Sequence, residues 1–388
     1  MISVEEALSR CLALTHVLPI EQIALRQAAA RYMPTPAIAK RDQPPFAASA
    51  MDGYAVQGDP APGDRFRVIG EAGAGHAFSG QVGVGQAVRI FTGAPVPTSA
   101  TRVVIQEDVT ADGPDITINP NADTAAHIRP QGQDFPAGAL LGPRLLRPND
   151  LALLAAMNVA VVPVSRRPVV AIIATGDELV VPGGAPAPDQ IIASNSYALA
   201  AMVEASGGIA RLLPIARDRE ADLRTVLELA LAADLIVTIG GASVGDHDLV
   251  ASVAASMGME RAFWKIAMRP GKPLMAGRIQ GIPMLGLPGN PVSAIVCGHL
   301  FLLPMLRAML GMPDPAPKTF QAVLTTDLPA NGPRTHYMRA RLSPTGIAPF
   351  ERQDSALLTI LTEADALLIR PMGDVARPAG AVVTYLPL

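Results

Sequence analysis

Between Arg167 and about residue 310, continuous apolar runs alternate with segments of helical periodicity, and this alternation constrains the fold more than any other feature. PVVAIIATG and DLIVTIGG each end in glycine and lack the polar alternation of a half-buried strand, which indicates strands buried on both faces. IPMLGLPGN closes the series, and another apolar segment begins at Pro291. Strands and helices in this order predict a doubly wound, mainly parallel sheet.

The sequence on either side of this region has a different pattern of apolar and polar residues. Ser3 and Glu6 form a Ser-x-x-Glu capping box at the start of a predicted helix that runs to His16. Short alternating runs divided by Gly and Pro predict β-rich structure near both ends of the chain. We therefore predict an α/β multidomain protein with a helical and β-rich N-terminal region (1–166, its β-rich subdomain at about 41–147), a central α/β domain (167–317) and a small β-barrel-like C-terminal domain (318–388).

Composition argues against several classes of protein. The formal net charge is −3 and basic residues form no cluster, which argues against a nucleic-acid partner. Two cysteines make neither a disulfide framework nor a Cys-x-x-Cys site, and this favours a reducing cytoplasm. Glu5 and Glu6 stand where a signal peptide would have its apolar core. The apolar stretch Ala294 to Leu310 is interrupted by polar residues and a proline, so we expect a buried helix and no membrane span.

Ligands of doubly wound sheets bind at the carboxyl ends of the strands, and three predicted strand ends carry unusual residues. The first is ATGDEL, in which Asp177 and Glu178 follow a buried strand. Adjacent carboxylates can hold a divalent cation through oxygen ligands, although a solvated turn is the plainer interpretation.

The second strand end is TIGGASVGDHD, from Thr238 to Asp248. Its glycines, Gly240, Gly241 and Gly245, let the backbone approach a ligand and turn its N–H groups toward an anion, and Ser243 adds a hydroxyl. The loop matches neither the Walker pattern nor the dinucleotide fingerprint. Its place between a buried strand and a helix nevertheless favours phosphate binding.

The third strand end is GLPGNPVSA, where Asn290 suits an N-cap and Pro291 the first position of a helix. An ordinary helix start explains much of this motif. The preceding MRPGKP loop adds Arg269 and Lys272, so an oxyanion held by these cations, Ser293 and backbone N–H groups is a coherent alternative. The histidines lack metal-ligand spacing, and no Gly-x-Ser-x-Gly elbow is present.

SAMDGYAV, IFTGAPVP, ATGDEL, GGASVGDHD, FWKIAMRPGKP and GLPGNPVSA occur in this order, and together they resemble the MoeA-type molybdopterin molybdenumtransferases, a family that includes the E domains of gephyrin and of its plant counterpart. The resemblance implies insertion of molybdate into adenylylated molybdopterin with release of AMP and help from Mg²⁺. It also implies a homodimer whose cleft is shared between the central domain of one subunit and the β-rich region of the other. A molybdopterin adenylyltransferase and acceptor molybdoenzymes are further expected partners.

The same resemblance assigns residues to this cleft. The expected catalytic residues are Asp52, Thr92, Asp134, Glu178, Asp218, Asp248 and Lys265. The expected ligand-binding residues are Ser243, Arg269, Lys272, Pro288, Pro291, Ser293, Arg339 and Ser355, together with Gly240, Gly241 and Gly245 from the loop described above. By their carboxylate chemistry, Glu178, Asp218 and Asp248 are the expected Mg²⁺ ligands.

The chain departs from the family pattern at three places. Arg269 replaces the first lysine of the usual Lys-Pro-Gly-Lys-Pro, Ala242 replaces a valine, and DSALLTIL replaces a serine- and glycine-rich pattern around Ser355. Two alternatives stay open: a non-catalytic molybdopterin-binding or scaffold protein of the same fold, and a molybdopterin adenylyltransferase. The latter resembles only the central domain, and the carboxylates and cations of the cleft motifs favour catalysis over a scaffold.

Overall fold

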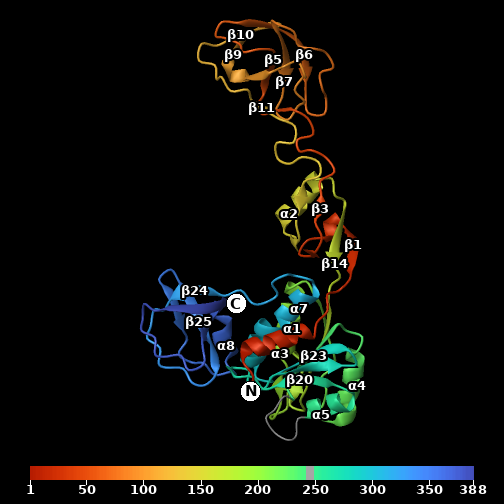
Figure 1. The fold of residues 1–388 in the computed structure, drawn as a ribbon, viewed down its shortest axis with the longest axis vertical. Helices are drawn as coiled ribbons and strands as arrows, with labels where there is room; N and C mark the ends of the chain where they lie inside the picture. The colour runs from red at the N-terminus through yellow and green to blue at the C-terminus, as the bar shows by residue number, and fades with distance from the viewer. Residues whose placement is uncertain (242–248) are drawn as a thin grey trace. The chain divides into compact units, whose positions relative to one another are not determined.

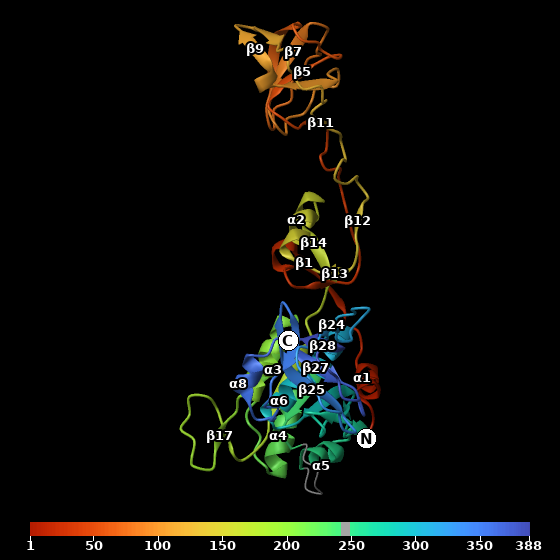
Figure 2. The same cartoon turned by 90° about the vertical axis from the view of Figure 1, so that its left-hand side faces the viewer.

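The computed structural model describes residues 1–241 and 249–388, and the chain divides into two compact units (Figures 1 and 2). Unit 1 comprises Met1–Glu21 and Ser165–Leu388, and unit 2 comprises Gln22–Val164. The first helix, α1 (Val4–Ala13), belongs to unit 1, whereas the sequence grouped it with the N-terminal region. Its buried face of Val4, Ala7 and Cys11 explains the difference, because these side chains join the core around the central sheet.

The central sheet of unit 1 has six strands in the order β18-β15-β19-β23-β22-β20. Their bounds are β15 Val169–Ala174, β18 Ile209–Leu212, β19 Leu235–Ile239, β20 Glu260–Trp264, β22 Met275–Ile279 and β23 Ile282–Leu287. The first four strands in the order are parallel, and β22 is antiparallel to both of its neighbours. The doubly wound, mainly parallel sheet predicted from the sequence is therefore confirmed.

Helices cover both faces of this sheet (Figure 1). Val170 and Ile172 point to the face covered by α1, α3 (Asn195–Ala205), α6 (Pro291–Cys297) and α7 (Leu303–Met309). Ala171 and Ile173 point to the other face, covered by α4 (Glu220–Ala230) and α5 (Leu249–Ser256). Alternate residues of one strand thus enter two cores, which is why β15 is apolar along its whole length.

The apolar segment after β23 is one helical run, Pro291–Met309, which includes a π-helical turn, η3 (Gly298–Leu302), between α6 and α7. The run is long and apolar enough to cross a membrane, but 72% of its most apolar window is buried within the protein. It packs into the core of unit 1, as expected for a buried helix.

The C-terminal sheet has the strand order β21-β25-β27-β28-β24, with β26 paired to β25. Its strands are β21 Met268–Arg269, β24 Phe320–Val323, β25 Thr335–Ser343, β26 Gly346–Pro349, β27 Ala366–Arg370 and β28 Val382–Pro387, and α8 (Leu358–Thr362) precedes β27. The strand β21 comes from the MRPGKP loop, and Arg269 pairs with His336. The central and C-terminal parts of unit 1 therefore share a sheet.

Unit 2 contains a second six-stranded sheet, in the order β8-β5-β7-β6-β10-β9. Its strands are β5 Gly53–Val56, β6 Arg65–Ala72, β7 Gln86–Ile90, β8 Arg102–Ile105, β9 Val109–Asp112 and β10 Asp115–Ile118. Four short pairs complete the strands: β1 (Ile20–Ala24) with β14 (Val161–Ser165), β2 (Tyr32–Met33) with β13 (Arg144–Leu145), β3 (Ala37–Ile38) with β12 (Leu140–Leu141), and β4 (Ala48–Ser49) with β11 (Ile128–Arg129). The helix α2 (Pro148–Ala156) packs on its own apolar core in this unit.

Candidate functional site

The carboxyl ends of β15, β19 and β23 lie side by side, as their parallel pairing requires. The N–H of Thr175 donates to the carbonyl of Ile239 at 3.0 Å, and the N–H of Gly240 donates to the carbonyl of Leu287 at 3.0 Å. Gly240 has a φ of 92°, and a Cβ there would lie 2.8 Å from the carbonyl oxygen of Thr175. A side chain at this position would be strained and crowded, so the strand ends can converge only around glycine.

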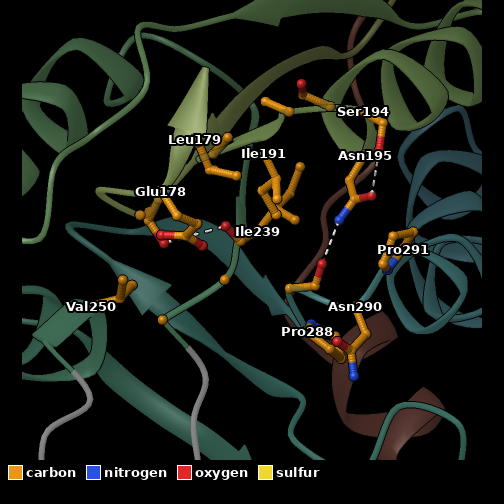
Figure 3. A pocket seen from close by; sticks show the side chains of 18 of the residues that line it. Glu178, Leu179, Ile191, Ser194, Asn195, Ile239, Val250, Pro288, Asn290 and Pro291 are labelled. Atoms are coloured by element: carbon orange, nitrogen blue, oxygen red, sulfur yellow. Dashed lines mark hydrogen bonds between the residues drawn. The ribbon is translucent and has the colours of Figure 1, made fainter. Parts of the chain in front are cut away.

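A pocket of about 1090 Å³ opens beyond these strand ends (Figure 3). It brings together six of the residues expected in the cleft: Glu178, Asp218, Gly240, Gly241, Pro288 and Pro291. Three further expected residues, Ser243, Gly245 and Asp248, lie outside the described residues. The convergence of the three motifs at one pocket follows from the strand order, because the motifs end three adjacent strands.

The acidic side of the pocket is built around the turn after β15. Gly176 has a φ of 144°, and a Cβ there would overlap the carboxylate of Glu178. Arg217 donates from Nη1 to the carbonyls of Asp177 at 2.9 Å and Leu179 at 3.2 Å, and the N–H of Asp218 donates to Asp177 Oδ1 at 3.2 Å. These bonds tie the turn that carries Glu178 to the segment that carries Asp218.

The donor set of this side fits a hard cation. Glu178 and Asp218 offer carboxylate oxygens to one pocket, and Mg²⁺ is typically held by one or two carboxylates together with substrate phosphates. The described residues contain no group of three histidine, cysteine or acidic side chains placed to hold a metal.

An apolar wall stands beside the carboxylates. The short strands β16 (Leu179–Val180) and β17 (Ile191–Ile192) pair in parallel, and the N–H of Ile191 donates to the carbonyl of Glu178 at 2.7 Å. Leu179, Ile191 and Ile192 line the pocket, yet Ile191 is 58% exposed. Sequence reasoning missed this wall, because two isoleucines after a proline-rich loop carry no signal beyond a short strand.

The turn after β23 is held from two sides. Asn195, the first residue of α3, donates from Nδ2 to the carbonyl of Gly289 at 2.7 Å (Figure 3). On the other side, Asn290 donates from Nδ2 to Ser355 Oγ at 3.1 Å, and the N–H of Val292 donates to the carbonyl of Ser355 at 3.0 Å. Pro291 opens α6, so the predicted helix start is confirmed, while the amide of Asn290 reaches the C-terminal sheet domain.

Sequence reasoning also missed Asn195. Ser194 donates to its Oδ1 at 3.3 Å, and both residues line the pocket. The Ser-Asn-Ser run at 194–196 signals a helix start and nothing more. Ser355 was expected only from family resemblance, and the structure places it against the turn and next to the pocket residue Ala356.

The expected cations and Ser293 are not among the described residues that line the pocket, although Pro273, next to Lys272, is. Arg269 is exposed, and Ser293 is buried in the first turn of α6. Lys265 has a left-handed backbone with a φ of 68°, and its Nζ lies 4.1 Å from the centroid of the Trp264 ring.

Arg339 is buried beneath the segment that carries Ser355. Its guanidinium donates to Gln353 Oε1 at 3.2 and 3.1 Å and to the carbonyl of Asp354 at 2.7 Å. Only 1% of Arg339 is exposed.

His336, which pairs with Arg269, is neutral at pH 7. Burial, and then the nearby arginines with Arg269 first among them, lower the pKa of His336 to about 4.

Unit 2 gathers the remaining three expected residues. Asp52 Oδ1 accepts both the N–H and the hydroxyl of Thr92, each at 2.7 Å, and these bonds lower the pKa of the Asp52 carboxyl. Asp134 lines a separate hollow of about 610 Å³ together with Gly93, the residue after Thr92, and Arg129. Thr92 therefore directly precedes a residue of this hollow, and Asp52 is hydrogen-bonded to Thr92.

Arg89 supports the Asp52 turn and was missed from the sequence. Its guanidinium carbon lies 4.9 Å from the ring centroids of both Tyr54 and Phe91, and Nη1 donates to the carbonyl of Gly53 at 3.3 Å. A single arginine on an alternating strand gave no signal, because two of its partners, Gly53 and Tyr54, come from a different strand.

Three family models match the chain in succession. They are the MoeA N-terminal region (domain I and II) at residues 2–158, a probable molybdopterin binding domain at 171–308 and the MoeA C-terminal region (domain IV) at 321–388. They cover both flanks of the central domain as well as the domain itself.

Relatives and solved structures agree with these matches. The chain is 36% identical over 376 residues to molybdopterin molybdenumtransferase 2 of Mycobacterium tuberculosis, covering 92% of each chain. It is 34% identical over 386 residues to molybdopterin molybdenumtransferase of Nostoc, covering 95% of this chain and 88% of that one. A crystal structure of the molybdopterin biosynthesis MoeA protein of Pyrococcus horikoshii matches 100% of this chain and 99% of its own at 30% identity, with a TM-score of 0.85.

Proposed function

The chain belongs to the MoeA family of molybdopterin molybdenumtransferases, and from that premise we propose that it inserts molybdate into adenylylated molybdopterin, releases AMP and uses Mg²⁺ as its cation. The observation that carries the proposal is the convergence of three strand ends on one pocket, with glycine at the closest approach and two carboxylates beside it.

The end of β19 at Gly240 and Gly241 is suited to bind the phosphate of the adenylylated pterin. Gly240 and Gly241 both have positive φ and expose backbone without a side chain, so a phosphate group can approach the main chain. The apolar wall of Leu179, Ile191 and Ile192 offers a surface for a planar ring on the other side of the pocket. Both halves of the substrate thus have a complementary surface.

The carboxylates supply the remaining chemistry. Glu178 and Asp218, with Asp248, would hold Mg²⁺, and the bound cation would offset charge on the phosphate oxygens. These residues would also fix the position of the phosphoanhydride relative to the incoming oxygen nucleophile. The mechanism needs no covalent protein intermediate, so positioning of the substrates and electrostatic stabilisation of the transition state would account for the rate enhancement.

The MRPGKP loop and the C-terminal domain are proposed to hold molybdate. Arg269 and Lys272 would offset its two negative charges, and Ser293 and Ser355 would donate hydrogen bonds. The buried bonds of Arg339 to Gln353 and Asp354 support a role in holding the Ser355 segment as well as in setting the local positive potential. Arg269 keeps the positive charge of the usual lysine with a planar, forked donor group.

We further propose a homodimer in which the partner subunit contributes Asp52, Thr92 and Asp134 to the cleft. The proposal is supported by the exposed, hydrogen-bonded Asp52 carboxylate and by the hollow that contains Asp134 in unit 2. A molybdopterin adenylyltransferase would supply the substrate, and molybdoenzymes that accept the finished cofactor would receive the product. A cytoplasmic location is consistent with this exchange.

Incubation of the purified protein with adenylylated molybdopterin, Mg²⁺ and molybdate tests the proposal. We expect AMP release that requires both the cation and molybdate. Binding of the substrate without AMP release under any of these conditions would instead favour a scaffold protein. The adenylyltransferase alternative does not explain the two flanking regions, which match the N-terminal and C-terminal models of the family.

A further inference from the structure

The turn Pro288–Asn290 forms one wall of the pocket and is attached to the rest of unit 1 through side chains. Asn195 reaches this turn from α3, and its Nδ2 lies 2.7 Å from the carbonyl oxygen of Gly289. Figure 3 shows the amide pointing from the helix to the turn across the edge of the pocket. We propose that Asn195 is a positioning residue for nucleotide binding, acting through this bond on the Pro288–Asn290 turn.

The orientation of the Asn195 amide is fixed by a second bond. Ser194 Oγ donates to Asn195 Oδ1 at 3.3 Å, which leaves Nδ2 to face the turn. The Asn195 side chain thus accepts from Ser194 through Oδ1 and donates to the carbonyl of Gly289 through Nδ2. Asn195 is half-buried, so the bond is only partly exposed to competition from water.

The opposite side of the turn is held by the C-terminal domain through Asn290 and Ser355. Between these two attachments, Gly289 lies against the central strand end, since a Cβ on Gly289 would lie 3.6 Å from the Cα of Gly240. A shift of the Pro288–Asn290 turn therefore changes its distance from the strand end at Gly240. Because both line the pocket, loss of the Asn195 bond should change the affinity of the pocket for a ligand.

This inference rests on the proposed function, because it takes the pocket to bind the nucleotide, and AMP is the probe that tests it. Asn195→Asp keeps the shape of the side chain and replaces the Nδ2 donor with a carboxylate oxygen. An ionised carboxylate would repel the carbonyl of Gly289, whereas a protonated one could donate to it. Falling pH should therefore restore the bond in Asn195→Asp, while Asn195→Ala has no group that can respond.

AMP affinity is measured by calorimetry between pH 8 and pH 4.5 for the wild type, Asn195→Asp and Asn195→Ala. At pH 8 we expect affinity to fall about tenfold in Asn195→Asp and about threefold in Asn195→Ala. As the pH falls, the affinity of Asn195→Asp should rise relative to that of Asn195→Ala. Ala201→Asp adds the same charge at an exposed position of the same helix, and it should follow the wild type.

Equal affinity of Asn195→Asp and the wild type at pH 8 would overturn the inference, as would a ratio between the two Asn195 variants that does not change with pH. Amide hydrogen exchange of the ligand-free protein provides a readout that does not depend on the proposed function. The amides of Val292 and Ala294, which donate to Ser355 and Asn290, should exchange faster in Asn195→Asp. If the wild type fails to bind AMP but this exchange still rises, the proposed function fails and the positioning of the turn stands.

Discussion

The backbone of Gly240 lies so close to Thr175 that a Cβ on residue 240 would be 2.8 Å from the Thr175 carbonyl oxygen. This contact joins the ends of β19 and β15 at the floor of the pocket. Strand ends in parallel sheets are a common place for ligands, but here the approach is close enough to exclude any side chain. The pocket therefore depends on a glycine at this point.

Gly240→Ala should lower stability through both backbone strain and the clash with Thr175, by about 2–4 kcal/mol. Gly183→Ala is the matched control, since Gly183 has a similar φ of 87° but open space around its Cβ position. The control should lose only the strain, about 1 kcal/mol. Urea unfolding followed by a probe in unit 1 compares the two. If both variants lose the same free energy of unfolding, the contact with Thr175 contributes nothing to the cost of Gly240→Ala.

Glu178→Gln should weaken the response of the pocket to Mg²⁺, because the amide is a poorer ligand for a hard cation than a carboxylate. We expect AMP release to slow by at least about 100-fold, and Mg²⁺ to lose most of its effect on AMP affinity. Glu204→Gln removes a charge from an exposed position of α3 and serves as the control. Unchanged Mg²⁺ dependence of AMP affinity in Glu178→Gln would remove Glu178 from the cation site.

Two histidines, the buried His336 and the half-buried His299, should make the protein sensitive to acid. Burial and then nearby arginines, Arg307 for His299 and Arg269 first for His336, lower the pKa of each from 6.5 to about 4. Each native histidine stays neutral while the unfolded chain protonates, so stability is full above about pH 6.5 and is lost as the pH falls toward 4. The loss should reach at most about 3 kcal/mol per histidine.

His336→Gln tests this origin of the acid sensitivity, because glutamine does not titrate. The slope of unfolding free energy against pH between 6.5 and 4 should become shallower than in the wild type, and His16→Gln, at an exposed residue before β1, should leave it unchanged. A slope that is identical in His336→Gln would assign the acid sensitivity to other groups.

The bond between Asn290 and Ser355 should make these two positions energetically dependent on each other. Asn290→Ala and Ser355→Ala each break the same bond, so the double variant should lose less AMP affinity than the sum of the single losses. A coupling energy of about 0.5–1.5 kcal/mol is expected from a double-mutant cycle. Strict additivity would mean that the C-terminal domain does not support the turn through this pair.

Much of the site was predictable because it follows from strand order. ATGDEL, TIGG and GLPGN each end a buried strand, and parallel pairing brings such ends together whatever the helices do. Gly240 was also predictable, since a glycine directly after a buried strand indicates a close backbone approach. The family resemblance added residues far from the central domain, among them Ser355, which no periodicity could have placed against Asn290.

The parts that could not be predicted depend on contacts between segments remote in sequence. Asn195 and Gly289 meet only because α3 and α6 pack on the same face of the sheet, and Ser-Asn-Ser reads locally as a helix start. Arg269 could be assigned a positive charge but not its pairing with His336 in the C-terminal sheet. For the same reason, amphipathicity predicts a buried face for α1 without naming its partner, which is the core around the central sheet.

The most direct test follows molybdenum itself. The purified protein is given adenylylated molybdopterin, Mg²⁺ and molybdate, and both AMP and molybdenum bound to the pterin product are quantified over time. A molybdenumtransferase should form one molybdenum-containing cofactor for each AMP released, and neither product should accumulate when molybdate is left out. Release of AMP without molybdenum in the pterin, or tight substrate binding with neither product, would contradict the proposed function.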